Sequence, residues 1–164
     1  MEMKKILESS MKIRFHDCDP FNHLNNSRYI DYIMSARTDQ LEAAYQLDIY
    51  KVAAEQGVGW VSAQTQISYL FPAFVGEEVR IQTRLLAFTE KSLLVEGMMY
   101  NKDQTVIKAV MWAKLVHFHL RTQKSHPHSG AFMDFFQQVV HPLTNDMHFE
   151  ERAKALKQMV WMDK

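Results

Sequence analysis

Groups able to carry out chemistry are concentrated in residues 14–32, which read RFHDCDPFNHLNNSRYIDY. Closely spaced within this segment are the carboxylates of Asp17 and Asp19, the thiol of Cys18, the imidazole of His23 and the adjacent amides of Asn25 and Asn26. A positioned aspartate can act as a general base on water or as a nucleophile. The segment is therefore the first candidate for a catalytic site.

The same segment contains the signals for the start of a helix. Asparagine is a preferred N-cap residue, so the helix is expected to begin near Asn25 or Asn26, and Ser27 suits its first turn. The backbone amides of a first helical turn have no intrahelical acceptor and carry partial positive charge. They would stabilise an oxygen that becomes negative during a reaction. Asp19 and an oxyanion site are thus predicted to lie side by side.

Three elements must position this segment. A short strand over residues 12–15 is predicted to lead into it and to end at Asp17. From Asn26 to about Leu47, apolar residues recur at three- and four-residue spacing without Gly or Pro, which predicts one long helix with a buried face. The break at residues 57–59, Gly-Val-Gly, marks the change to strands.

The middle of the chain predicts an antiparallel sheet. Apolar and polar residues alternate over residues 79–85, and two further strands, 92–100 and 106–120, are joined by the polar turn 101–104. The last strand is apolar on both sides, which suits a central position. One long helix followed by antiparallel strands indicates an α+β architecture in which the sheet wraps around the helix.

The C-terminal part predicts two helices. Apolar residues recur at helical spacing in two groups separated by Pro142 and the pair Asn145-Asp146, namely Phe132, Phe135, Phe136, Val139 and Val140, then Leu156, Met159, Val160 and Met162. An exposed phenylalanine stripe would be unfavourable. The tail is therefore expected to cover part of the sheet or the mouth of a pocket.

Composition restricts the class of protein. The 164 residues, 47% hydrophobic and 23% charged, suit one globular domain. Lys plus Arg and Asp plus Glu both number 19, so no overall field favours nucleic acid or an anionic membrane, and a small-molecule partner is expected. The single cysteine, the absence of a signal-peptide pattern in MEMKKILESS and the lack of a membrane-spanning apolar run predict a cytoplasmic protein.

Two alternative sites, and a chemical role for Asp17, are weaker interpretations. Cys18 could be a nucleophile with His23 and Asn25, but groups so close in sequence rarely converge as a triad, and the adjacent carboxylates disfavour a thiolate. His117 and His119 share a strand face that a metal could use, but no Cys or carboxylate follows at ligand spacing. Asp17 is interpreted as a structural residue of the turn.

The segment resembles the hotdog-fold acyl-CoA thioesterases of the 4-hydroxybenzoyl-CoA thioesterase type. Their signature is Asp-x-Asp, then often Gly-His-Val-Asn-Asn, then Tyr on a long helix; here it reads DCDPFNHLNN over residues 17–26, followed by Tyr29. Asn22 stands in place of Gly, and Asn also tolerates the left-handed backbone region. The resemblance extends more weakly over residues 62–120. Plant acyl-carrier-protein thioesterases share a similar Asp, His and Asn spacing, but carry Asn where this chain has Phe21.

The resemblance implies a fold and an assembly. Residues 1–125 would form a hotdog thioesterase domain, with the sheet wrapped around one long central helix. The tail has no counterpart in the resemblance; the helices that its spacing predicts would make residues 126–164 a helical extension packed on the same domain. Hotdog protomers close their edge strands by pairing and place the site between them, which implies a homodimer or homotetramer. No metal or redox cofactor is implied.

The resemblance also implies residue roles. Asp19 would be the general base or the nucleophile, the backbone amide at Asn26 would hold the thioester carbonyl, and His23 and Asn25 would shape the loop or the water site. Asn26 and Tyr29 would contact the substrate, an acyl-CoA or acyl-carrier-protein thioester. Two other possibilities are a noncatalytic acyl-thioester-binding protein and a hotdog hydratase or dehydratase, whose expected His and acid pattern is absent here.

Overall fold

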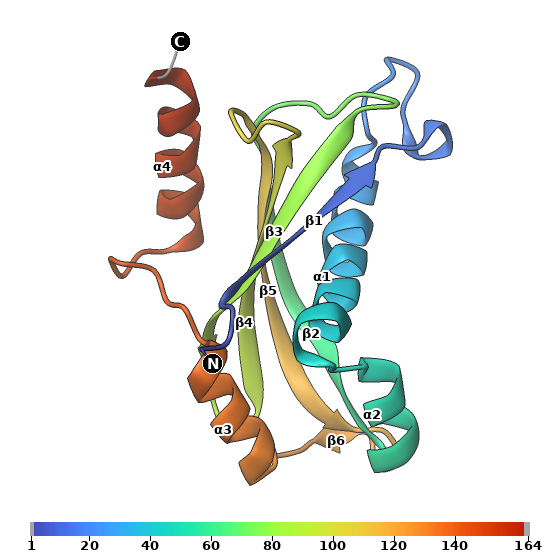
Figure 1. Cartoon of the computed structure of the whole chain (residues 1–164), viewed down its shortest axis with the longest axis vertical. Coiled ribbons are helices and arrows are strands. Elements are labelled where there is room, and N and C mark those ends of the chain that lie inside the picture. Colours follow the sequence, from blue (N-terminus) through green and yellow to red (C-terminus); the bar gives the residue numbers. More distant parts are fainter. Residues whose placement is uncertain (1, 163–164) are drawn as a thin grey trace.

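A single antiparallel sheet curves around helix α1 in the computed structural model, which describes residues 2–162 and side chains through residue 159 (Figure 1). The strands run in the order β1-β3-β4-β5-β2, and the short β6 pairs with the end of β5. Their bounds are β1 Ile6–Lys12, β2 Val58–Tyr69, β3 Glu78–Phe88, β4 Ser92–Asn101, β5 Ile107–His119 and β6 Lys124–Ser125. The predicted α+β architecture is confirmed.

Two helices lie beside the curved inner face, α1 (Tyr29–Tyr45) and α2 (Ile49–Gln56), and two follow the sheet, α3 (Gly130–Val139) and α4 (Phe149–Met162). Short 3₁₀ turns at Phe15–Asp17 and Asn26–Arg28 flank the candidate catalytic segment. Within the described part of the chain, no helix combines the length and apolar character needed to cross a membrane.

Helix α1 is seated on the inner face of the sheet by a close approach to β4. Ile33 is fully buried, and a Cβ atom added at Gly97 would lie 2.3 Å from its Cγ2. Only glycine leaves room for Ile33 at this position. Around this contact, the helix and the sheet form one core that includes Tyr29, Ala36, Val79, Ile81, Met99 and Met111.

Two predicted boundaries are wrong. The first strand covers residues 6–12 and pairs with β3, whereas residues 15–17 form a 3₁₀ turn in place of the predicted strand end. The helix predicted to reach Leu47 ends at Tyr45, and a second helix, α2, was not predicted. Its signals were present: Asp48 caps the first turn by accepting from the amides of Tyr50 and Lys51, and Gly57 ends the helix at φ 67°.

The predicted strands of the middle region are confirmed to within a few residues as β3, β4 and β5. In β5, residues 107–113 are all buried, as expected of a strand covered on both faces, and β5 lies between β4 and β2. The covering on the two sides comes from different helices. Figure 1 shows α1 and α4 on opposite sides of the sheet.

The C-terminal extension packs on both faces of the sheet. Helix α3 buries Phe136 and Val139 against Leu85, Leu93 and Val95. Helix α4 buries Phe149, Ala153 and Leu156 against the opposite face, around Val110 and Trp112. The expectation that the tail covers part of the sheet is confirmed, whereas the side chains of Val160 and Met162 lie outside the described residues. The domain boundary at residue 125 stays a prediction.

A buried carboxylate fixes α4 to the sheet. Glu96 of β4 is 1% exposed and accepts hydrogen bonds from Arg84 of β3, Trp112 of β5 and Arg152 of α4. These charge-assisted bonds lower the pKa of Glu96 against the opposing effect of its burial, chiefly through Arg152 and Trp112. Helix α4 therefore supplies, through Arg152, a second cation for this carboxylate in addition to Arg84 of the sheet.

Two buried histidines fix the segment of the chain that leads from β5 into α3. Nδ1 of His117 donates to the carbonyl of His126 (2.7 Å), and Nδ1 of His128 donates to the carbonyl of Thr89 (3.0 Å). The other ring nitrogen of His128 accepts from the indole N–H of Trp60 (3.0 Å), whereas Nε2 of His117 is buried and has no partner among the residues that the structure describes. Both arrangements need a neutral imidazole, and burial lowers the pKa of His117 and of His128.

Replacing Gly97 by Ala is expected to lower the free energy of unfolding by about 1–3 kcal/mol, because the added methyl overlaps the Ile33 side chain. The measurement is urea denaturation of a double-mutant cycle. Ile33→Ala alone costs about 2–5 kcal/mol by opening a cavity. In the Ile33→Ala background, Gly97→Ala should cost much less; an unchanged cost would show that Ile33 is not what excludes a side chain there.

Stability is expected to decrease as the pH falls below about 6.5, where the unfolded chain binds protons at its histidines and the folded chain, with lowered pKa values, does not. The thermal midpoint should therefore be highest above this value and decline until the lowered folded-state pKa values are reached. The paired variant His117→Gln/His128→Gln should show a flatter pH profile in this window. His148→Gln, at an exposed position, should keep the wild-type slope; equal slopes in all three proteins would refute the assignment.

Candidate active site

Asp19 lies in a tight turn that fixes one of its two carboxylate oxygens. Oδ1 accepts from the backbone amides of Phe21 (2.8 Å) and His23 (3.1 Å), and the amide of Asp19 donates to the carbonyl of His23 (2.8 Å). Oδ2 has no hydrogen-bond partner in the part of the chain that the structure describes, and the residue is half-buried. The turn thus orients the carboxylate while leaving one oxygen available.

Asn22 provides the left-handed backbone that this turn needs. Its φ is 62°, as predicted for the residue that replaces glycine. Its amide donates to the carbonyl of Asp19 (3.0 Å), and its carbonyl accepts from the amide of Val75 (2.9 Å). The substitution of Gly by Asn therefore preserves the turn and connects it to the loop after β2.

The helix start follows directly. Asn25 is the N-cap of the 3₁₀ turn that leads into α1, and its Oδ1 accepts from the amide (3.1 Å) and the hydroxyl (2.9 Å) of Ser27. The carbonyl of Asn26 accepts from the hydroxyl of Tyr69 (2.9 Å), which ties the helix start to the end of β2. Among the described residues, nothing accepts from the Asn26 amide. This amide is a free donor at the positive end of a helix.

Asp17 has a different environment from Asp19. Its Oδ2 accepts from the hydroxyl of Tyr32 (2.6 Å), its carbonyl accepts from the amide of Asn25 (2.9 Å), and Arg28 lies 3.7 Å from Oδ1. These bonds fix the position of the helix start relative to the turn. The Asp17 carboxylate is engaged by Tyr32 and lies near Arg28, so its role is structural, in agreement with the interpretation from sequence.

Tyr29 lies in the core and does not line an open surface in the single chain. Its side chain is 2% exposed, and its hydroxyl accepts from the amide of Ala73 (3.0 Å). Burial raises the pKa of Tyr29. Its ring meets that of Tyr69 edge to face, with the centroids 5.1 Å apart. Tyr29 therefore holds the loop of residues 70–77 in place beside the Asp19 turn.

His23 packs on the same loop. Its ring meets Phe74 edge to face at 5.1 Å, and the two residues form an isolated backbone bridge. Lys108, a residue that the sequence analysis did not consider, supports this loop from behind. Its ammonium is 3.0 Å from Glu77, donates to the carbonyl of Pro72 (2.9 Å), and lies 5.2 Å from the centroid of the Phe74 ring.

The alternative sites receive no geometric support. The thiol of Cys18 donates to the carbonyl of Arg14 (3.4 Å), and burial together with the charges of Asp17 and Asp19 raises the pKa of this thiol, which disfavours a thiolate. Over residues 2–162, no three His, Cys, Asp or Glu side chains gather as they would around a metal ion. The ring of His126 lies near those of His117 (5.7 Å between centroids) and His119 (5.5 Å), but the three do not form a metal-binding group among the described residues.

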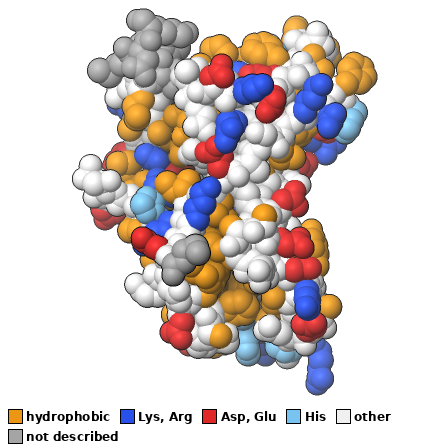
Figure 2. Space-filling model, viewed as in Figure 1, with side chains coloured by type: hydrophobic (Ala, Val, Ile, Leu, Met, Phe, Trp, Pro, Cys, Tyr) orange, Lys and Arg blue, Asp and Glu red, His pale blue; other side chains and the backbone are white. Residues whose placement is uncertain are grey.

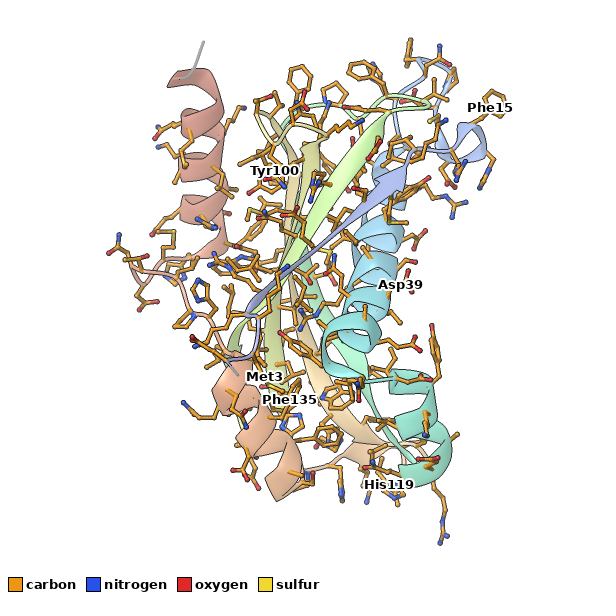
Figure 3. All side chains as sticks on the ribbon, viewed as in Figure 1. Met3, Phe15, Asp39, Tyr100, His119 and Phe135 are labelled. Atoms are coloured by element: carbon orange, nitrogen blue, oxygen red, sulfur yellow. The ribbon has the colours of Figure 1, made fainter. Side chains whose placement is uncertain are left out.

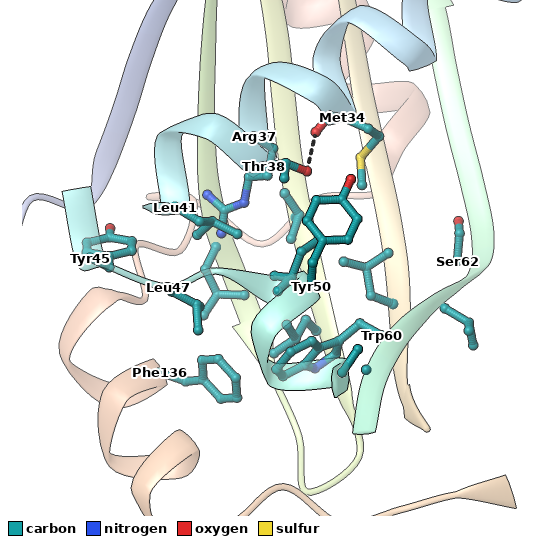
Figure 4. Close-up of a pocket in the computed structure, with 18 of the residues that line it drawn as sticks. Met34, Arg37, Thr38, Leu41, Tyr45, Leu47, Tyr50, Trp60, Ser62 and Phe136 are labelled. Carbon is teal, nitrogen blue, oxygen red and sulfur yellow. Dashed lines mark hydrogen bonds between the residues drawn. The ribbon is translucent and has the colours of Figure 1, made fainter. Parts of the chain in front are cut away.

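A largely apolar cavity of about 460 Å³ lies below α1, between α2, β2 and α3 (Figure 4). Its volume is typical of a small-molecule site. Its lining includes Met34, Leu41, Trp60, Leu115 and Phe136, with Arg37 as its one charged residue among those described. The cavity does not include Asp19. No sequence pattern indicated it, because α1, β2 and α3 come together only in the folded chain.

Aromatic side chains surround the Asp19 turn on the outside. Phe15 is 82% exposed and projects from the molecule (Figure 3), and Phe21 and Phe74 are also exposed. Figure 2 shows apolar side chains at other places on the face as well, with side chains of both charges between them. The aromatic rim is therefore one of several exposed apolar areas, and such areas can serve as contact surfaces.

Comparison with known proteins agrees with the fold described above. A family model described as the thioesterase-like superfamily matches residues 13–140. The long-chain acyl-CoA thioesterase FadM of Escherichia coli (strain K12) is 24% identical over 134 residues, which cover 82% of this chain and 99% of FadM. The family match includes the Asp19 turn, the helix start and strands β2 to β6.

Solved structures share the fold. The probable thioesterase YbaW of Escherichia coli superposes with a TM-score of 0.70 at 23% identity, over 82% of this chain and 99% of that one. The protein SAV2348 of Staphylococcus aureus, solved in complex with CoA, gives a TM-score of 0.74 at 11% identity, over 89% and 92% of the two chains. With its hotdog architecture and the family match over most of its length, the chain belongs to the thioesterase-like superfamily.

Proposed function

We propose that this protein is an acyl-CoA thioesterase that uses Asp19 to hydrolyse an acyl thioester to the free acid and CoA. The observation that carries the proposal is that one short segment presents both a free Oδ2 on Asp19 and, at the start of the helix that follows, a backbone amide on Asn26 without an acceptor among the described residues. A basic oxygen and an oxyanion donor are the two groups that this hydrolysis requires. FadM, the E. coli relative, is named for activity on long-chain acyl-CoA.

Two routes use the same carboxylate. As general base, Asp19 takes a proton from water, whose oxygen attacks the thioester carbonyl while the C–S bond breaks and the thiolate leaves with a proton. As nucleophile, Asp19 itself attacks the carbonyl, the C–S bond breaks and CoA leaves as a thiolate that takes up a proton; water then hydrolyses the mixed anhydride to the free acid and restores the Asp19 carboxylate. Both routes place negative charge on the carbonyl oxygen, and the Asn26 amide at the positive end of the helix stabilises that charge.

The other predicted residues act by positioning. Asn25 caps the turn that directs the Asn26 amide outward, and His23 joins the Asp19 turn to Phe74. Tyr29 acts through the loop that it holds at Ala73, so its proposed contact with substrate is indirect. The cavity beneath α1 receives the acyl group because its lining is mostly apolar.

We further propose a homodimer in which the β2 edges pair. Residues 61–66 of this edge strand are exposed, and an unpaired edge is a template for strand addition. Antiparallel pairing about a two-fold axis would bring the Tyr69 end of one β2 beside the Val58 end of the other. Tyr69 is bonded to Asn26, and residues 59–62 line the cavity, so Asp19 of one protomer would act at the cavity of its partner.

The leaving group and the cytoplasmic location stay predictions. CoA is preferred because a relative is named for acyl-CoA and a structure of the same fold was solved with CoA. An acyl-carrier-protein thioester is the alternative, and parallel assays with the same acyl group on CoA and on a carrier protein distinguish the two. Absence of turnover with both, together with tight binding of an acyl-CoA, would favour a noncatalytic binding protein.

Asp19→Asn is expected to lower kcat by at least ~10²-fold, because it removes the basic oxygen while keeping the acceptor for the turn amides. Affinity for a nonhydrolysable acyl-CoA thioether should change little, since the lost group acts mainly in the transition state. The measurements are steady-state thiol release and calorimetry. Cys18→Ser is the adjacent control and should stay active; loss of turnover in that variant with retention in Asp19→Asn would transfer the role to the cysteine.

The shared site is tested by mixing two inactive variants. Asp19→Asn removes the base, and Ala53→Trp fills the cavity from α2. Each homodimer should be inactive, whereas co-expression should restore about a quarter of wild-type turnover, because random pairing makes half of the dimers mixed and each mixed dimer has one intact site. No recovery, in a mixture that light scattering shows to be dimeric, would place Asp19 and its cavity in the same protomer. A monomer mass at micromolar concentration with full activity would remove the dimer.

A further inference from the structure

Arg37 is a buried cation without a counter-charge. It lies on α1 with its side chain in the cavity (Figure 4), and the residue is 8% exposed. Its Nη1 donates to the hydroxyl of Thr83 (3.0 Å), which is its one hydrogen bond within the described residues, and no carboxylate among them is within ion-pair distance. A guanidinium has five N–H donors, so most of its capacity is unused.

The neighbours of Arg37 fix its direction. The Thr83 hydroxyl donates in turn to Oε1 of Gln40 (2.6 Å), and Nε2 of Gln40 donates to the carbonyl of Ile81 (3.0 Å) and to Ser9 (2.8 Å). This buried chain of hydrogen bonds is complete without the remaining guanidinium N–H groups. It holds Arg37 at β3 in one orientation, as a preorganised binding group must be held.

Other basic side chains packed into this fold differ from Arg37 because each is paired with a carboxylate. Arg84 and Arg152 share Glu96, and Lys108 is paired with Glu77. Burial lowers the pKa of Arg37 to about 10, so it is still charged at neutral pH. A buried charge without a partner is costly, and a bound anion would remove that cost.

We propose that the cavity selects an acyl chain whose far end carries a carboxylate, and that Arg37 binds this carboxylate through its paired N–H groups. Guanidinium and carboxylate match in geometry as well as in charge. The proposal rests on the thioesterase function above and specifies its substrate class, an ω-carboxyacyl thioester. The apolar lining contributed by Leu41, Leu85 and Leu115 contacts the intervening methylene groups.

The position of Arg37 fits the end of a medium-length chain. Thr83 is on β3, three strands from the exposed β2 edge, which is roughly 14 Å across the sheet at the usual strand spacing. The register sets Thr83 level with Ile67 of β2, so a chain that enters at residues 59–62 also runs along the strands. An extended chain advances about 1.3 Å per carbon, given C–C bonds near 1.5 Å. A chain of roughly ten carbons or more would therefore reach the guanidinium. The phosphates of CoA are a poorer match, because they stay hydrated and Arg37 is buried among apolar side chains.

The test compares thioesters of equal carbon number that end in a carboxylate or in a methyl group: adipoyl-, suberoyl- and sebacoyl-CoA against hexanoyl-, octanoyl- and decanoyl-CoA. The wild-type protein should prefer the carboxylates in kcat/KM by about tenfold or more at the best length. Arg37→Met, which keeps the length and removes the charge, should reverse this preference. Arg121→Met removes an exposed arginine elsewhere and should leave the preference unchanged.

A binding measurement separates this inference from the function on which it rests. Nonhydrolysable S-(ω-carboxyalkyl)-CoA and S-alkyl-CoA thioethers are titrated into Asp19→Asn with Arg37 intact and with Arg37→Met or Arg37→Lys. Tighter binding of the carboxylated thioether that Arg37→Met abolishes and Arg37→Lys keeps in part supports the inference, even if no thioester is hydrolysed. Hydrolysis of methyl-ended thioesters with equal or greater efficiency in the wild-type protein, without Arg37-dependent binding, would overturn it while leaving the thioesterase function intact.

Discussion

The seating of α1 on the sheet at Gly97 is the contact on which the other features depend. Because β4 has no side chain there, Ile33 reaches the sheet and the helix axis comes close to it. The same helix carries the Asn26 amide at its beginning and Arg37 further along its buried face. A shift of α1 would therefore move the proposed oxyanion donor and the charged end of the cavity together. Close packing makes such a shift costly.

Hydrogen bonding separates the roles of two nearby carboxylates. Asp17 is occupied by Tyr32 and lies beside Arg28, so it fixes the helix start. Asp19 accepts its turn amides through one oxygen and keeps the other free. The two aspartates are separated by a single residue. The groups around them give Asp17 a structural role and Asp19 a proposed chemical role.

Buried charges show how the fold uses its polar groups. Glu96 and Lys108 are both buried and both are satisfied, the first by arginines from β3 and α4 and the second by Glu77 and a loop carbonyl. These pairs fix α4 on one face and the loop of residues 70–77 beside the Asp19 turn. Against this background, a lone guanidinium in an apolar cavity is a departure from the rule that buried charges are paired. Such departures are expected at functional sites.

Local signals in the sequence were sufficient for the elements and for the turn. The Asn25 cap, the left-handed conformation of Asn22 and the strands β3 to β5 depend on residues close in the chain, and the structure confirms them. The same kind of signal, Asp48 and Gly57, was present for α2 but was not used. The roles of single residues were harder to predict. Tyr29 was expected to contact the substrate, but it is buried and its hydroxyl accepts from the amide of Ala73, in a loop far along the chain.

The sequence by itself determined the family, the α+β class and the segment that carries Asp19, because spacing and capping are local properties. Only the tertiary structure decided where the apolar cavity lies, that α3 and α4 cover opposite faces, and that Arg37 has no carboxylate partner among the described residues while Lys108 has one. Each of these depends on contacts between residues more than thirty positions apart, as Arg37 and Thr83 are at a separation of 46. Helical periodicity marks a residue such as Arg37 as lying on a given face, but whether a buried charge meets a counter-charge depends on the strands and helices that fold against it.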